Sequence, residues 1–238
     1  KRNGKQNLKI DRRKNYYVVL DTETCPIDKD LQAVDPCNMW VYDIGWAIID
    51  KKGNVYRTRS FLNTDIFLEE AELMKSAYYA DKIPKYKREA KEGKRKFAHW
   101  ATIRKVLAED MKEFNTNIVV AHNARFDDIS IKRTQVWLTK SKYRYFLPYG
   151  TIVWDSMKMA LDTIAKQPSY IKWCEDNGKM TKHKKPRPQV KAETLYQYLT
   201  GNFDFKEEHT GLEDVLIEKE IFVACLRQHK PMRRALYG

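Results

Sequence analysis

Residues 16–24 read Tyr-Tyr-Val-Val-Leu-Asp-Thr-Glu-Thr, and they constrain the fold more than any other stretch of the chain. Five consecutive apolar or aromatic residues, two of them β-branched, predict a strand that is buried on both faces. Asp21 and Glu23 follow at once, and we interpret them as the end of that strand. Because unpaired buried charge is costly, two such carboxylates are expected to face a cation or water. A solvated strand end would show the same residues, so the pair needs support from elsewhere in the chain.

The chain carries a net charge of +13, and its positive charge is concentrated in three segments. Residues 1–14 hold seven Lys and Arg against one acid, residues 82–105 hold ten against two, and residues 166–191 hold eight against two. The rest of the chain is acidic overall. Basic segments around an acidic remainder indicate a protein that binds a polyanion near a cation-binding centre. The alternative is that these lysines only keep the surface soluble.

With 238 residues, 42% of them hydrophobic and 32% charged, the chain suits one large α/β domain or two small ones. No apolar run approaches the roughly 18 residues of a membrane span, and no signal-peptide pattern opens the sequence. The four cysteines lie far apart without a Cys-x-x-Cys pair, which argues against a disulfide framework or a zinc site. We therefore expect an intracellular, cytoplasmic protein without a membrane partner.

Four further segments have the short, apolar and turn-bounded character of strands. The first two are joined by the turn sequence Lys51-Lys52-Gly53-Asn54, which favours an antiparallel hairpin. The predicted strands are residues 41–50, 55–62, 118–121 and 151–154.

Helical composition dominates most of the remaining segments. Residues 67–114 are rich in Glu, Ala and Lys, with breaks expected at Pro84 and Gly93. Further helices are expected from residues 122–128 to about Leu138, at 193–199 and at 210–227, with loops at 25–36 and a loop or lid at 166–191. Two apolar stripes at helical spacing are expected to cover the sheet: Ile103, Leu107, Met111 and Phe114, and Leu212, Leu216, Phe222 and Leu226.

Three motifs occur in order along this framework, two at predicted strand ends and one at the head of the last helix: Asp21-x-Glu23, Asn123-x-x-Phe126-Asp127 and His209-x4-Asp214. In this order and at these places they resemble the motifs of the DEDDh, or DnaQ-like, 3′–5′ exonucleases of the ribonuclease H-like superfamily. The resemblance spans about residues 16–226. The sequence departs from many relatives after the first motif, where Cys25-Pro26 stands in place of a small residue and a glycine.

The resemblance implies a ribonuclease H-like α/β fold, with a mixed five-stranded sheet, an antiparallel second strand, and helices on both faces. We expect a basic arm at residues 1–15 and a single exonuclease domain at 16–238, with basic insertions at about 82–105 and 166–191. The insertions are expected to hold substrate by phosphate contacts, Lys94, Arg95 and Lys96 among them.

The activity implied is metal-dependent 3′-to-5′ exonuclease action on single-stranded or frayed 3′ ends, with DNA favoured, releasing nucleoside 5′-monophosphates. A polymerase or replication protein is a possible partner. Two alternatives stay open. An RNA-trimming exoribonuclease would use the same chemistry, and a polymerase-associated nucleic-acid-binding module would not cleave.

By resemblance, four carboxylates are expected to hold two Mg²⁺ or Mn²⁺ ions: Asp21, Glu23, Asp127 and Asp214. Hard divalent ions do prefer carboxylate oxygens. His209 is expected to take the proton from the attacking water, since an imidazole of pKa about 6.5 exchanges protons near neutral pH. Predicted substrate contacts are Thr22, Thr24, Asn123 and Phe126, although the last two could equally shape the turn.

Other residues have structural interpretations. We expect His122 to be structural and Asp155 to cap a helix. Trp100, Tyr170 and Trp173 lie beside or within the basic segments, where they either stack on bases or pack in the core.

Overall fold

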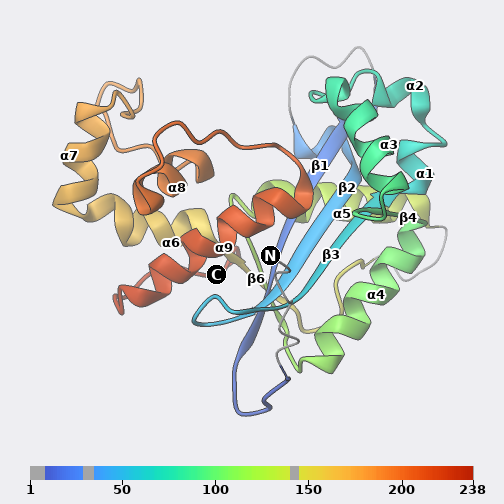
Figure 1. The fold of residues 1–238 in the computed structure, drawn as a ribbon, viewed down its shortest axis with the longest axis horizontal. Coiled ribbons are helices and arrows are strands. Elements are labelled where there is room, and N and C mark those ends of the chain that lie inside the picture. Colours follow the sequence, from blue (N-terminus) through green and yellow to red (C-terminus); the bar gives the residue numbers. More distant parts are fainter. Residues whose placement is uncertain (1–8, 29–34, 140–144, 238) are drawn as a thin grey trace.

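The computed structural model describes residues 9–28, 35–139 and 145–237, and its centre is a six-stranded mixed sheet (Figure 1). The strand order is β4-β3-β2-β1-β5-β6, with β1, β2 and β3 antiparallel, β5 and β6 parallel to β1, and β4 parallel to β3. The predicted mixed α/β class and the antiparallel second strand are confirmed, and a sixth strand is added. The strands are β1 Tyr16–Pro26, β2 Met39–Asp50, β3 Val55–Asn63, β4 Lys96–Ala98, β5 Ile118–Ala121 and β6 Ile152–Asp155.

Helices cover both faces of the sheet, and the alternation of side chains along β1 separates the two cores. Tyr17 and Val19 pack with residues of α9 (Gly211–Arg227). Val18 and Leu20 pack on the other face with residues of α4 (Trp100–Glu113) and α5 (Arg125–Leu138), including the predicted stripe of α4. The remaining helices are α1 Thr64–Phe67, α2 Ala71–Met74, α3 Ile83–Lys91, α6 Ser156–Asp162, α7 Pro168–Asp176 and α8 Ala192–Thr200. None of the described helices is long and apolar enough to cross a membrane.

β1 is longer than the sequence predicts. Instead of ending at Asp21 with a loop from Cys25, the strand continues to Pro26 beside β2, and its register shifts between Glu23 and Thr24. This extension is possible because β2 is buried along all 12 of its residues and pairs with β1 beyond Asp21. Asp21 and Glu23 therefore lie inside the sheet rather than at the end of a strand.

Two predicted stretches differ from the structure. Residues 67–114 include the short strand β4, and Pro84 lies in the first turn of α3 instead of breaking a helix, because a proline fits the first helical turn. Within 166–191, the predicted loop or lid, α7 forms and buries Tyr170 and Cys174 against the core.

The buried face of α9 coincides with the predicted stripe only in part. Phe222 of the stripe is fully buried together with Val215 and Ile221, whereas Leu216 of the stripe is 39% exposed. The same buried face carries Asp214 and Glu218. A prediction that relies on the spacing of apolar residues does not find this buried face, because two of its residues are acidic.

The predicted basic arm is only partly described. Residues 1–8 lie outside the described residues. Lys14 is fixed against the sheet, because its Nζ pairs with Asp50 at 3.2 Å and donates to the Tyr56 hydroxyl at 2.7 Å.

Candidate active site

The carboxylates of β1 face the beginning of α9. Alternate residues of a strand point to the same side of the sheet, so Asp21 and Glu23 lie on the face of β1 where Tyr17 and Val19 pack on α9. A Cβ on Gly45, the β2 partner of Asp21, would lie 2.5 Å from the Leu212 nitrogen, and one on Gly211 would lie 2.8 Å from the Gly45 nitrogen. Two glycines therefore permit a direct backbone contact that brings the start of α9 next to these acids.

α5 supplies a further carboxylate to β1. Asp127 is buried and accepts hydrogen bonds from the Thr22 backbone nitrogen at 3.1 Å and from its hydroxyl at 2.7 Å. The adjacent Asp128 instead pairs with Lys132 at 2.6 Å and accepts a hydrogen bond from the Tyr237 hydroxyl at 2.5 Å. Consecutive helical residues project about 100° apart, so only one of the two acids reaches β1.

The segment before α9 adds a histidine and another carboxylate. Glu23, His209 and Asp214 each offer one ligand atom, and these atoms lie within 4.8 Å of one another. Asp214 Oδ2 accepts a hydrogen bond from the Thr210 nitrogen at 3.1 Å. Asp214 Oδ1 and Asp21 Oδ2 are buried and have no hydrogen-bond partner among the described residues. Such oxygens are costly unless a cation or water satisfies them, and this donor set suits a hard divalent ion.

The acids of this cluster resist ionisation. Burial, followed by the neighbouring carboxylates, raises the pKa of Asp21 and that of Glu23 well above their usual values. Burial raises the pKa of Asp127 to about 7 and that of Asp214 to about 8. Without a cation the cluster therefore retains protons near neutral pH, and a divalent ion would replace them.

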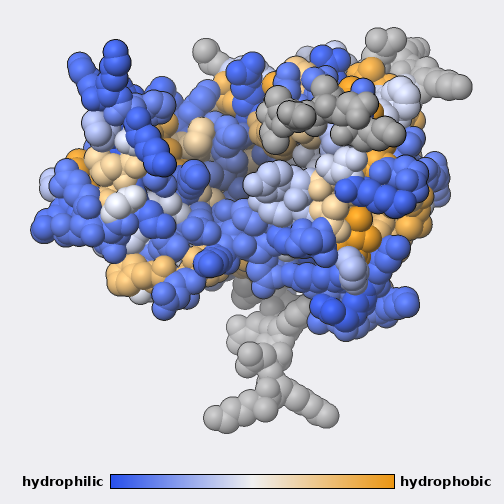
Figure 2. Space-filling model, turned by 90° about the horizontal axis from the view of Figure 1, so that it is seen from above, coloured by the Kyte–Doolittle hydropathy of each residue, from blue (hydrophilic) through white to orange (hydrophobic). Residues whose placement is uncertain are grey.

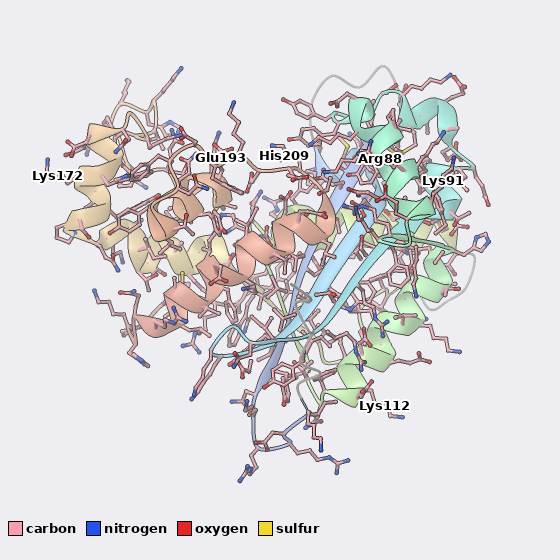
Figure 3. All side chains as sticks on the ribbon, in the orientation of Figure 1. Arg88, Lys91, Lys112, Lys172, Glu193 and His209 are labelled. Carbon is pink, nitrogen blue, oxygen red and sulfur yellow. The ribbon has the colours of Figure 1, made fainter. Side chains whose placement is uncertain are left out.

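His209 is partly exposed at the edge of this cluster. Figure 3 shows it between Glu193 of α8 and Arg88 of α3. Partial burial and then the nearby Lys82 lower the pKa of the imidazole below its usual 6.5. The ring is therefore largely neutral at pH 7 and able to accept a proton.

Sequence reasoning missed Glu218. This residue lies one turn after Asp214 on α9, is buried, and accepts a hydrogen bond from the His122 nitrogen at 3.2 Å. After burial, its charge is the largest cause of the raised pKa of Asp21. The signal in the sequence is its spacing of four from Asp214, which places both on one helical face.

The structural interpretations of two other residues are confirmed. His122 lies with Nδ1 2.9 Å from the Ser156 hydroxyl and Nε2 2.7 Å from the Val190 carbonyl oxygen. Asp155 caps α6 by accepting a hydrogen bond from the Met157 nitrogen at 2.9 Å.

Two of the three aromatic candidates for base stacking pack in the interior. Trp100 and Tyr170 are buried in the two cores, and Trp173 is partly buried against Tyr170.

The predicted substrate contacts divide into two groups. The Thr22 hydroxyl is bonded to Asp127, and Thr24 is partly buried just after the register shift. Asn123 is exposed with a φ of +62°, and together with Phe126 it lines a surface pocket of about 350 Å³ beside Pro36. Asn123 and Phe126 are thus open to a ligand, whereas the Thr22 hydroxyl is engaged in its hydrogen bond to the Asp127 carboxylate.

The sheet order, its antiparallel second strand and the helices on both faces define a ribonuclease H-like fold. Three solved structures with this fold are exonucleases. E. coli exonuclease I in complex with a 5cy-dT13 oligonucleotide gives a TM-score of 0.52 at 16% identity, over 90% of this chain and 41% of that one. Exonuclease I from Methylocaldum szegediense gives 0.56 at 18% identity, over 91% and 41%. The zinc-bound E. coli exonuclease I–ssDNA complex gives 0.51 at 14% identity, over 90% and 40%.

This chain therefore spans less than half the length of these neighbours, and the likeness at such identity establishes the fold. No protein-family model and no curated protein matches the sequence.

Proposed function

We propose that this chain is a DEDDh-type, metal-dependent 3′-to-5′ exonuclease that acts on single-stranded DNA ends and releases nucleoside 5′-monophosphates. The observation that carries the proposal is the pair of buried oxygens on Asp21 and Asp214 that have no partner among the described residues, with the Asp214 carboxylate close to Glu23 and to the imidazole of His209. A protein that only binds nucleic acid gains nothing from such a cluster, because acids repel a polyanion unless cations are bound. The fold shared with exonuclease I supports the same substrate class.

The residues fit two hard divalent ions, Mg²⁺ or Mn²⁺. By resemblance, Asp21 together with Glu23 and Asp214 would hold one ion, and Asp21 together with Asp127 would hold the other. Bound ions supply water activation and stabilise the charge that develops on the phosphate. Thr22 fixes the orientation of the Asp127 carboxylate through two hydrogen bonds.

His209 accepts the proton of the attacking water at a ring nitrogen. Its lowered pKa keeps the imidazole unprotonated and ready for this role at neutral pH. We expect Asn123 and Phe126 to receive the terminal nucleotide in the pocket that they line. By resemblance to the family, the backbone near Thr24 would contact the terminal sugar.

The test uses 5′-labelled DNA and RNA oligonucleotides of one sequence, with Mg²⁺, Mn²⁺ or EDTA. We expect DNA to shorten from its 3′ end with either metal, to stay intact in EDTA, and to release nucleoside 5′-monophosphates. Faster cleavage of RNA would make the chain an exoribonuclease. Binding of both oligonucleotides without cleavage would make it a binding module. A polymerase or replication partner stays a prediction, tested by whether such a protein co-purifies with the chain.

A further inference from the structure

The segment around Tyr79 touches His209 directly. The Tyr79 ring stacks on the imidazole, with centroids 4.5 Å apart and planes inclined by 11°. The Nζ of Lys82 lies 4.1 Å from the centroid of the same tyrosine ring. Stacking covers one face of the imidazole and leaves its nitrogens, which bond in the ring plane, accessible to a proton.

The backbone of His209 is also held. Its φ of +48° lies in the left-handed region, which is unfavourable for a residue with a Cβ. Lys82 Nζ donates hydrogen bonds to the carbonyl oxygens of Glu208 and His209, and the Tyr86 hydroxyl donates to the His209 carbonyl at 3.5 Å. An unfavourable conformation persists where its surroundings fix it, and here they fix the direction of the imidazole.

Arg95 holds the other end of the same segment. It is 2% exposed and bonds to Asp43 at 2.8 Å, Glu89 at 2.7 Å and Glu213 at 2.6 Å. Asp43 also accepts a hydrogen bond from the Gly211 nitrogen at 3.0 Å. Buried ion networks add little net stability, but this one ties the first turn of α9 to β2 and α3.

We propose that Tyr79, Lys82, Tyr86 and Arg95 form a brace that positions the His209 imidazole for proton transfer. The inference rests on the proposed function, and it makes the first basic insertion and the residues just before it part of the catalytic apparatus. Tyr79 is a positioning residue, because it acts through the imidazole. Without the stacked ring the imidazole samples more orientations, and fewer of them allow proton transfer.

Two variants and one control isolate the stack. Tyr79→Ala removes the ring, Tyr79→Phe keeps it, and Tyr78→Ala removes a neighbouring ring that is 79% exposed and meets Tyr79 edge-on. In single-turnover cleavage, Tyr79→Ala should lower the maximal rate about 10–100-fold while the half-saturating substrate concentration stays within about threefold. Tyr79→Phe and Tyr78→Ala should stay within about threefold of wild type in both quantities.

A second readout does not use activity. In protein labelled with ¹³C-histidine, the ring signals of His209 are assigned by their absence in His209→Gln among the five histidines of the chain. Stacking on Tyr79 should move these signals upfield through the tyrosine ring current. The upfield shift should disappear in Tyr79→Ala and persist in Tyr79→Phe and Tyr78→Ala.

The two readouts separate the possible failures. A wild type with the shifted signals but no cleavage of any oligonucleotide overturns the proposed function, and the brace with it. If wild type cleaves, two results overturn the brace alone. One is a maximal rate in Tyr79→Ala that equals that of wild type, whatever the half-saturating substrate concentration, and the other is an equal loss of maximal rate in Tyr78→Ala and Tyr79→Ala.

Discussion

The two basic insertions look alike in sequence and differ in the structure. Residues 82–105 carry ten cations and residues 166–191 carry eight, each against two acids. In the first, Arg95 is buried among carboxylates, and Lys82 and Lys85 bond to the segment before His209. In the second, the cations of residues 179–191 are partly or fully exposed, and within the described part of the chain none of them forms an ion pair. Figure 2 shows hydrophilic side chains over much of the end that carries α7 and the loop after it.

The difference shows that a count of cations does not reveal which way they face. The sequence predicts that Lys94, Arg95 and Lys96 contact phosphate together. This is wrong for Arg95, which is buried, and Lys94 pairs with Glu92 at 2.7 Å. Part of the first insertion thus packs against the segment that carries His209. In the second, the exposed cations of residues 179–191 form no ion pair among the described residues, so we expect them to be available to a polyanion.

The largest expected effect concerns stability. Arg95→Met removes the guanidinium that three buried or partly buried carboxylates share, so the free energy of unfolding should fall by about 3–5 kcal/mol. Lys184→Met, an exposed cation of the second insertion, should change it by no more than about 0.5 kcal/mol. Urea denaturation followed by circular dichroism measures both. Equal losses of stability in Arg95→Met and Lys184→Met would remove the distinction between the insertions. If Arg95→Lys loses less stability than Arg95→Met, the buried positive charge itself accounts for part of the effect.

The acid cluster beside the first insertion should make metal-free stability depend on pH. Because the pKa of Asp214 is raised to about 8, the folded state binds more protons than the unfolded state between about pH 4 and pH 8. The free energy of unfolding therefore falls as pH rises through this window. Asp214→Asn removes this contribution, so without metal its melting temperature should exceed that of wild type more at pH 8 than at pH 5.

The control for that experiment lies in the second insertion. Asp176→Asn alters an exposed carboxylate that pairs with Lys172 at 3.1 Å, and its difference from wild type should stay small at both pH values. Adding Mn²⁺ at pH 8 should raise the melting temperature of wild type more than that of Asp214→Asn, because the ion replaces the protons. The account would be contradicted if, without metal, the difference in melting temperature between Asp214→Asn and wild type were smaller at pH 8 than at pH 5.

The smallest effect concerns substrate binding. Replacing Lys182, Lys184 and Lys185 by Gln should reduce the log–log salt slope of oligonucleotide binding by about 0.7 for each phosphate that is no longer neutralised. Lys94→Gln should change the slope less, since Lys94 is already paired with Glu92. The maximal single-turnover rate should stay near that of wild type in both. An unchanged slope in the triple variant would assign those lysines to solubility.

The sequence predicts much of this architecture, because long apolar strands and the short motifs that follow apolar runs are local patterns. The strand at residues 16–20, the stripe of α4 and the cap formed by Asp155 all follow from spacing. The structure also brings Glu23, His209 and Asp214 together, although they come from opposite ends of the chain.

Other features depend on tertiary packing, which spacing does not encode. β4 has three residues, lies beside helical segments and exists through pairing with β3. Arg95 sits in a run of cations, and its burial arises from carboxylates on β2, α3 and α9. Glu218 belongs to none of the sequence motifs, and it is buried because α9 lies close against the sheet.

The central claim is that the Asp21 cluster binds the metal ions on which cleavage depends. Asp21→Asn removes one charge at almost unchanged volume, so the fold should survive. Binding of Mn²⁺, followed by the electron paramagnetic resonance of the free ion, and cleavage of labelled DNA are measured on the same preparations. We predict two Mn²⁺ ions per wild-type chain, weakened binding in Asp21→Asn, and a rate lower by several orders of magnitude. An Asp21→Asn protein that binds Mn²⁺ as wild type does, or degrades DNA at nearly the wild-type rate, would contradict the account.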